Sequence, residues 1–337
     1  MNATKHEVLQ SNYLETSYFH DNVDSSEYII EVKNLEKYFN GFKAVDGINF
    51  KIRKGELFSL LGPNGAGKST TIRMLTTVLK PTSGDARISE YSLKREKNNI
   101  KSLIGVCPQE NIVFDALTAE DNVEFVGRMH GMSADDVKER SKVLLEKMNI
   151  AGRKKPAKTF SGGMKRRLSL AMSLVHQPEI LFLDEPTAGL DPQARRIVWD
   201  FIHELKTTGM TIILTTHDMA EADALSDHLA IIDHGKVIAC GTVDDIKRSS
   251  DNGNVIEISF FSREELIKAK QQLEHVDSVK QIICGENNKL TISFAGGAKG
   301  FKRDILNRLE SFKTLHFRED SLEEIFLKLT GRELREN

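Results

Sequence analysis

Two short segments of this sequence carry residues suited to phosphate chemistry. The first, GPNGAGKS at 62–69, follows the apolar stretch ELFSLL and precedes a helical pattern. In that context G-x-x-x-x-G-K-[ST] forms a loop whose backbone N–H groups and helix N-terminus face phosphates. Lys68 is expected to reach the β- and γ-phosphates of a nucleotide, and Ser69 to ligate Mg2+. The predicted nucleotide site comprises Gly62, Pro63, Asn64, Gly65, Ala66, Gly67, Lys68, Ser69 and Thr70.

The second segment, ILFLDEP at 180–186, is an apolar strand that ends in two carboxylates. Asp184 is placed to hold Mg2+, and Glu185, one residue further on, can accept a proton from an attacking water. General-base catalysis of this kind is worth about 10²–10⁴ in rate. A lone Asp-Glu pair is commonly an acidic helix cap, but here the apolar run and the phosphate loop favour catalysis.

The segments around these motifs alternate between helix and strand. The hydrophobic periodicity predicts helices over 68–80, 164–177 and 193–209, and apolar strands over 179–186 and 210–218. Strands that are apolar throughout and separated by helices are typical of a parallel sheet with both faces covered. The sequence therefore predicts an α/β core.

Capping signals mark the start of two more helices. Thr118 is followed three residues later by Asp121, and Ser133 by Asp136, which is the spacing of a capping box. Between the phosphate loop and these helices, the segment PTSGD at 81–85 predicts a turn.

The composition changes near residue 250, where KRSSDNGN predicts a linker at 247–253. Upstream we expect a polar, flexible tail at 1–27 and a main domain at 28–246. Downstream, residues 254–337 show the order strand, helix, strand, strand, helix, strand, followed by one extra helix. That order predicts a small α+β, ferredoxin-like C-terminal domain, for which we expect a regulatory or dimer-stabilising role.

The balance of charges limits the classes of partner that the chain is expected to bind. Lys+Arg number 47 and Asp+Glu 49, a net charge of -2, which argues against wholesale binding to nucleic acid or anionic lipid. We therefore expect no nucleic-acid partner. The apolar runs fall short of the roughly 18 residues that a membrane helix needs. The three cysteines are far apart in sequence and are predicted to be small apolar side chains in a reducing compartment.

A third segment, FSGGMKRR at 160–167, resembles the signature segment of the ATP-binding-cassette (ABC) ATPases. Other residues match the family's motifs in the family's order: Tyr38, then Gln109 in GVCPQEN, Asp191 in GLDP and His217 in LTTHDM. The resemblance covers about residues 30–245. It implies a P-loop ABC ATPase domain with a mixed sheet and a helical subdomain at about 110–172.

The resemblance also implies roles for the matched residues. Tyr38 would stack on the adenine of ATP, although Phe39 is an adjacent rival, and His217 would polarise the γ-phosphate. The implied catalytic residues are Glu185, His217, Lys68 and Gln109, and the implied Mg2+ ligands are Ser69, Asp184 and Gln109.

In this family two ATPase domains pair head to tail, and the signature of one closes over the nucleotide of the other. Ser161, Gly162 and Gly163 would then contact the γ-phosphate held by a second chain, which implies a dimer, expected to be a homodimer. Phe160 and Met164 depart from the family's usual Leu and Gln. For two of the three basic residues in KRR, a solvated helix turn is favoured, with no role assigned.

The sequences in and around the motifs, and the tail SLEEIFLKLTGRE at 321–333, resemble those of drug-resistance exporter ATPases of prokaryotes. The segment around Gln109 is also similar to lipid-exporting ABC proteins. The resemblance implies a separate transmembrane permease that docks around residues 110–128, and a peripheral location on the cytoplasmic face of the membrane. The alternatives are a soluble ABC ATPase of translation or DNA repair, and a nucleotide-gated scaffold without catalysis. The single cassette, the lack of long coiled coils and the presence of Glu185 argue against them.

Overall fold

The structure is a computed structural model that describes residues 27–249, 254–294 without 275, 277 and 286, 308–318 without 310, and 321–330. The chain divides into two compact units, Met1–Thr242 and Val243–Asn337. The predicted flexible tail, apart from Glu27, lies outside the described residues.

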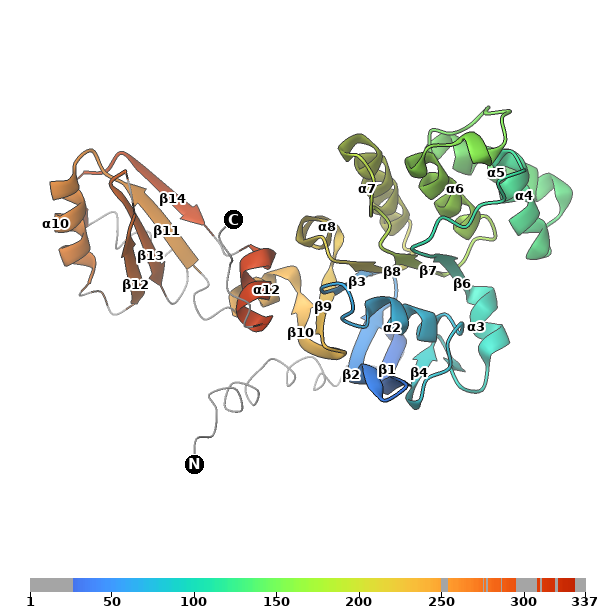
Figure 1. The fold of residues 1–337 in the computed structure, drawn as a ribbon, viewed down its shortest axis with the longest axis horizontal. Helices are drawn as coiled ribbons and strands as arrows, with labels where there is room; N and C mark the ends of the chain where they lie inside the picture. Colours follow the sequence, from blue (N-terminus) through green and yellow to red (C-terminus); the bar gives the residue numbers. More distant parts are fainter. Residues whose placement is uncertain are drawn as a thin grey trace. The chain divides into compact units, whose positions relative to one another are not determined.

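The first unit is built on a six-stranded sheet with the order β10-β9-β3-β8-β7-β6 (Figure 1). Neighbouring strands from β9 to β6 run parallel, and β10 pairs antiparallel to β9, so the sheet is mixed as expected. The strands are β3 (Leu57–Leu61), β6 (Ile104–Cys107), β7 (Ile180–Asp184), β8 (Thr211–Thr216), β9 (His228–Asp233) and β10 (Lys236–Thr242).

Both faces of this sheet are buried, which explains why β3, β7 and β8 are buried at every position and show no alternation of apolar and polar residues. In β7, Ile180 and Phe182 pack into one hydrophobic cluster, whereas Leu181 and Leu183 pack into a second cluster on the opposite face. Alternate side chains of a strand point to opposite faces, so a strand covered on both sides is predominantly apolar along its whole length.

A second, antiparallel sheet covers one face of the unit. Its order is β2-β1-β4-β5, formed by β1 (Tyr28–Phe39), β2 (Phe42–Arg53), β4 (Ser83–Ile88) and β5 (Tyr91–Ser92). Helix α2 (Lys68–Leu75) contributes Ile72, Met74 and Leu75 to the cluster that both sheets share. The short helix α3 (Lys97–Leu103) leads into β6.

Helices lie on the other side of the mixed sheet. They are α4 (Ala119–Met129), α5 (Ala134–Lys147), the 3-10 turn η3 (Ala157–Thr159), α6 (Gly162–Leu174), α7 (Pro192–Thr207) and α8 (Met219–Leu225) (Figure 1). Helix α6 contacts β6, α8 contacts β3 and β8, and α4 and α5 pack against α6. The full capping box at Thr118 is confirmed. At Ser133 the side chain accepts from the Asp136 N–H, as one half of such a box does. No helix in the described part of the chain is long and apolar enough to cross a bilayer.

The second unit begins with α9 (Val243–Ser249) and contains a four-stranded antiparallel sheet of order β12-β13-β11-β14. Its described elements are β11 (Asn254–Ser259), α10 (Arg263–Leu273), β12 (Val279–Cys284), β13 (Lys289–Phe294), β14 (Thr314–Arg318) and α12 (Leu322–Thr330). The third strand lies between the first two, as in a split βαβ unit, which supports the ferredoxin-like prediction. The helix predicted at 301–312 lies largely outside the described residues.

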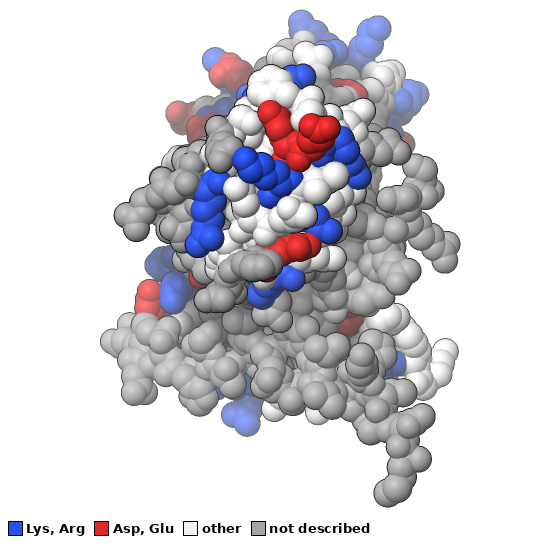
Figure 2. Space-filling view, turned by 90° about the vertical axis from the view of Figure 1, so that its left-hand side faces the viewer, with Lys and Arg blue, Asp and Glu red and all other residues white. Residues whose placement is uncertain are grey.

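The surface of the second unit carries both signs of charge. In α10, Lys268 and Lys270 share the helix with Glu264 and Glu265, and Figure 2 shows basic and acidic side chains beside one another on this face. One face of the sheet buries an apolar cluster that includes Ile258.

Three boundaries differ from the sequence prediction. The helix expected to reach residue 80 ends at Leu75, because Thr77 has φ 65°, which a helix cannot contain. Strand β4 begins at Ser83, inside the expected turn at 81–85. The expected linker at 247–253 begins inside α9, so residues 247–249 are helical.

Candidate active site

The order of the parallel strands brings the sequence motifs to one edge of the mixed sheet. Strands β3, β8, β7 and β6 are successive neighbours, with Leu61 opposite Thr216, Thr215 opposite Asp184, and Leu183 opposite Cys107. Because these strands run in one direction, the segments that follow them meet at their carboxyl ends. The phosphate loop, the carboxylate pair, His217 and Gln109 all lie there.

The phosphate loop joins β3 to α2 and needs glycine at both of its ends. A Cβ at Gly62 would lie 2.2 Å from the Ile232 carbonyl oxygen, and one at Gly67 would lie 2.4 Å from that of Ala44. Gly67 also has φ 107° at the N-cap of α2. The backbone therefore passes too close to its neighbours for any side chain, which gives the loop its tight turn.

Lys68 lies across the loop that it follows. Its Nζ donates to the carbonyl oxygens of Gly62 at 2.7 Å and Pro63 at 3.1 Å. Burial lowers the pKa of the Lys68 ammonium, and the carboxylates of Glu185 and Asp184 oppose that shift. A buried ammonium held by loop carbonyls is a cation placed where phosphate oxygens would enter.

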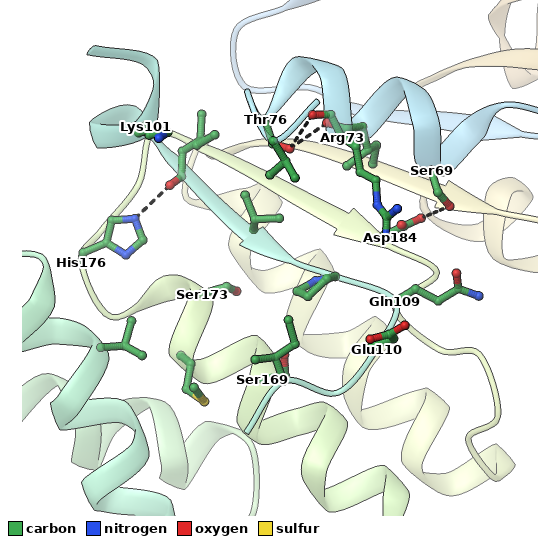
Figure 3. Close-up of a pocket in the computed structure, with 18 of the residues that line it drawn as sticks. Ser69, Arg73, Thr76, Lys101, Gln109, Glu110, Ser169, Ser173, His176 and Asp184 are labelled. Carbon is green, nitrogen blue, oxygen red and sulfur yellow. Dashed lines mark hydrogen bonds between the residues drawn. The ribbon is translucent and has the colours of Figure 1, made fainter. Parts of the chain in front are cut away.

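Two oxygen atoms from different segments meet beside the loop. The Ser69 hydroxyl donates to Asp184 Oδ1 at 2.9 Å (Figure 3). Thr215, on β8, donates its hydroxyl to the same carboxylate oxygen at 2.5 Å. Thr215 was not among the predicted site residues; the only signal for it is its place two residues before His217 at the end of an apolar strand.

Glu185 is the meeting point of the remaining predicted residues. Its carboxylate lies 3.2 Å from His217 Nδ1 and 3.7 Å from Lys68 Nζ, and it accepts from Gln109 Nε2 at 3.2 Å. The Glu185 side chain is buried, while His217 is half exposed. These contacts surround a single carboxylate with a cation, an imidazole and an amide, as a proton-transfer site requires.

Glu185 has an unusual backbone. Its φ is 49°, in the left-handed region that residues other than glycine rarely adopt. Its N–H donates to both the carbonyl oxygen and the hydroxyl of Thr215, at 3.1 and 3.0 Å. Strained backbone of this kind persists only where neighbouring groups hold it.

Comparison with known proteins identifies the family. The sequence model described as "ABC transporter" matches residues 45–188. The linearmycin resistance ATP-binding protein LnrL of Bacillus subtilis is 36% identical over 318 residues, which are 91% of this chain and 100% of that protein. The chain belongs to the ABC transporter family.

A second relative and a solved structure agree with that assignment. The daunorubicin/doxorubicin resistance ATP-binding protein DrrA of Streptomyces peucetius is 38% identical, covering 90% of this chain and 92% of that protein. A dimeric post-hydrolysis structure of the ATP-binding cassette MJ0796, bound to ADP and Pi, has a TM-score of 0.59 at 26% identity. It covers 64% of this chain and 98% of that chain. The predicted fold and the prediction of an ABC ATPase are confirmed.

The ABC signature residues do not join the cluster around Glu185 within this chain. Ser161 is the N-cap of α6, where its hydroxyl accepts from the Met164 N–H at 3.3 Å. Ser161 and Gly162 are exposed, and a Cβ at Gly162 would meet open space. The N-terminus of α6 is therefore exposed to solvent.

Two other ABC motif residues also lie apart from the Glu185 cluster. Asp191 caps α7 by accepting from the Ala194 N–H at 2.8 Å. Tyr38 lies half-buried near the end of β1, and the Lys43 ammonium lies 5.2 Å from its ring centroid. Its rival, Phe39, is 44% exposed.

The basic run of the ABC signature differs from the prediction. None of its three members is a freely solvated side chain: Lys165 pairs with Asp115 at 2.7 Å, and Arg167 donates to the Met148 carbonyl at 2.7 Å. Arg166 is buried, and its guanidinium reaches the ends of β6 and β7. Its burial left no signal in the sequence, because its partners are backbone groups 18–20 and 57–58 residues away.

A cavity of about 650 Å³ opens between the ABC core and its helical insert. Figure 3 shows Ser69 and Arg73 of α2 on one side and Ser169 and Ser173 of α6 on the other, with Gln109 between them. The rest of the lining is largely apolar and includes Ile72, Val106, Ile112, Val126 and Met172. The cavity thus extends from Gln109, which contacts Glu185, to the helical insert.

Proposed function

We propose that this chain is the ATP-hydrolysing subunit of an ABC exporter, and that it works as a head-to-tail dimer beneath a separate membrane permease. The observation that carries the proposal is the convergence of Lys68, Gln109 and His217 on the buried carboxylate of Glu185, directly beside a phosphate-binding loop.

Glu185 is proposed to be the general base that accepts a proton from the attacking water. Its two oxygens face different neighbours: Oε1 lies near Lys68 and His217, and Oε2 accepts from Gln109. These contacts fix the direction of the carboxylate, which is what proton transfer needs from its base. Lys68 and His217 are proposed to stabilise charge on the γ-phosphate.

Ser69 and Asp184 fit a magnesium ion. Both offer oxygen atoms, the ligand type that Mg2+ prefers, and the two oxygens already lie 2.9 Å apart. A site with one or two protein oxygens is typical where nucleotide phosphates complete the coordination. When bound, Mg2+ would neutralise negative charge on the phosphates. Thr215 would orient Asp184 through its hydroxyl, and Gln109, the third proposed ligand, lies within reach of the same strand end.

The signature would act on the nucleotide of the second chain. Ser161, Gly162 and Gly163 begin a helix of 13 residues, and helix N-termini attract anions through free N–H groups and the helix dipole. Since these residues do not join the Glu185 cluster of their own chain, they are available to contact the γ-phosphate bound by a partner chain. Tyr38 is proposed to stack on adenine and Asp191 to lie at the dimer contact.

The permease would dock at the helical insert. Four apolar side chains of this region are exposed, namely Ile112, Phe114, Phe125 and Met129, and Ile112 also lines the cavity between insert and core. Phe114 and Phe125 pack edge to face with ring centroids 4.8 Å apart. The relatives are named as drug-resistance ATP-binding proteins, which supports a drug-like or lipid-like exported substrate. The proposed location is therefore the cytoplasmic face of the membrane.

Replacing Glu185 tests the proposed chemistry. Glu185→Gln keeps the shape of the side chain and one acceptor oxygen, but it replaces the other oxygen with an NH2 donor and removes the basicity of the carboxylate. We expect ATP hydrolysis to fall by about 10²–10⁴-fold while ATP binding persists and an ATP-bound dimer accumulates. The matched control is Glu179→Gln, an exposed glutamate next to the opposite end of β7, which should hydrolyse ATP normally. Normal hydrolysis by Glu185→Gln would refute the base assignment.

A further inference from the structure

Arg166 is a buried cation to which the proposed ATP hydrolysis assigns no role. It lies in the second turn of α6 and is 3% exposed. Its guanidinium reaches three successive carbonyl oxygens at the end of β7: Nη2 donates to Asp184 at 2.6 Å and to Glu185 at 3.0 Å, and Nε donates to Pro186 at 2.9 Å. Desolvating a guanidinium is costly unless its donors are satisfied, and these carbonyls satisfy them.

The same guanidinium also holds the segment that carries Gln109. Its Nη1 donates to the carbonyl oxygen of Pro108 and, at 3.2 Å, to that of Gln109. One planar group therefore joins the start of the signature helix, the segment after β6 and the segment after β7. A guanidinium presents its donors in a fixed fork, so it sets the spacing between the segments that it bridges.

The carbonyls that Arg166 holds flank the strained residue of the site. Glu185 has φ 49°, and Thr215 fixes its N–H from one side. Arg166 fixes the carbonyls of Asp184, Glu185 and Pro186 from the other side. Together these bonds determine the backbone on both sides of the Cα from which the carboxylate projects. A left-handed backbone at a non-glycine residue is stable only under such constraint.

We propose that Arg166 is a positioning residue for ATP hydrolysis. It holds the backbone of Glu185 in the conformation that aims the carboxylate at Lys68 and His217, and it ties that backbone to Gln109 and to the signature helix. Arg166 itself touches no reacting atom. The proposal rests on the proposed function, in which Glu185 is the general base.

Substitution of Arg166 in two backgrounds tests this role. Arg166→Met and Arg166→Lys are made in the full chain, each with Glu185 present and with Glu185→Gln. We expect kcat to fall roughly 10- to 100-fold with Glu185 present, because small misplacement of a catalytic group has effects of that size. The Kd for ATP should not change. In the Glu185→Gln background the same substitutions should change the residual rate little, because the two residues act as one unit.

A residue that only stabilises the fold would behave differently. It would lower the folded fraction, but the rate per folded molecule would stay the same, and any loss would be equal in both backgrounds. Arg166→Lys keeps the charge and most of the volume, so it provides the test if Arg166→Met does not fold. The control is Arg140→Met, at a half-buried arginine of α5 that has no place in the proposed ATP site, and it is expected to leave kcat unchanged.

Each outcome decides between the two proposals. Equal losses in both backgrounds, or wild-type kcat in Arg166→Lys, would overturn the positioning role while leaving Glu185 as the base. Normal hydrolysis by Glu185→Gln alone would overturn the base assignment, and the positioning role would fall with it.

Discussion

Gly65 and Gly67 illustrate two different reasons why a position in the phosphate loop favours glycine. Both have positive φ, at 83° and 107°, but a Cβ at Gly65 would meet open space whereas one at Gly67 would strike the Ala44 carbonyl. Gly65→Ala should therefore cost only the left-handed backbone penalty of about 1–2 kcal/mol. Gly67→Ala should cost more, since backbone must also move, and should abolish ATP binding.

Chemical unfolding of both variants, together with a nucleotide-binding titration, measures the difference. Equal losses of stability and of ATP affinity in the two variants would contradict the steric account of Gly67.

At the residue scale, the sequence predicted those side chains whose chemistry fixes their spacing. Lys68, Ser69, Asp184 and Glu185 sit in motifs where loop, strand and helix leave little freedom, and the structure brings them together. Arg166 and Thr215 were missed because their importance comes from contacts between distant segments. The left-handed backbone of Glu185 is equally invisible, since the residue type gives no sign of it.

At the scale of elements, the ends of α4 and α6 meet at a stacked pair of histidines. The rings of His130 and His176 lie with centroids 3.8 Å apart and planes 11° from parallel. His176 Nε2 lies 3.0 Å from the carbonyl oxygen of Ile104, to which it donates, and its Nδ1 is buried without a partner in the described part of the chain (Figure 3). Burial lowers the pKa of both rings; at His176 the Ile104 carbonyl opposes the shift and His130 adds to it.

This pair makes stability depend on pH. The pKa of each of the two histidines is lower in the folded chain than its ordinary value, so on acidification these histidines are protonated first in the unfolded chain. The free energy of unfolding is therefore full above about pH 6.5 and falls as the pH drops below that value. His176→Gln keeps a donor for Ile104 but cannot titrate. Its Tm should therefore fall less than that of the wild type between about pH 7.5 and 5.5.

The matched control for that comparison is His203→Gln, at an exposed position of α7, which should follow the wild type. Identical Tm losses on acidification in wild type and His176→Gln would show that the buried pair is not responsible.

Among the elements, long periodic helices and apolar strands were predicted well, and their ends less well. The helix after the phosphate loop stops at Leu75, where the packing of Thr76 and Thr77 in the core decides the backbone, whereas the apolar pattern continues to Leu79. Strand β4 begins inside an apparent turn because pairing with β1 overrides the local preference of Ser83 and Gly84.

At the scale of the whole molecule, the exposed apolar group on the insert should decide whether the chain reaches the membrane. Ile112 is 58% exposed and also lines the cavity beside Gln109. Ile112→Glu should reduce co-sedimentation with membranes that contain the proposed permease by on the order of tenfold, because a charge would enter an apolar contact. ATP hydrolysis by the isolated chain should not change.

Val143→Glu, at an exposed apolar position on α5 of the same insert, provides the control and should co-sediment normally. Equal co-sedimentation of both variants, or membrane binding without the permease, would contradict docking at this surface.

Each ATP site is proposed to be shared between two chains, and a mixture of two inactive variants distinguishes this from a site that each chain completes alone. Lys68→Ala inactivates the phosphate loop. Gly162→Asp places a negative charge at the open start of α6, where a side chain has room, and should repel the γ-phosphate.

In a head-to-tail pair of these two variants, one site carries both defects and the other carries none. An equal mixture should therefore recover roughly a quarter of the wild-type rate of ATP hydrolysis, since half of randomly formed dimers would hold one intact site of two. If each chain instead completed its own site, the mixture would stay as inactive as its components, and that result would rule out an ATP site shared between two chains.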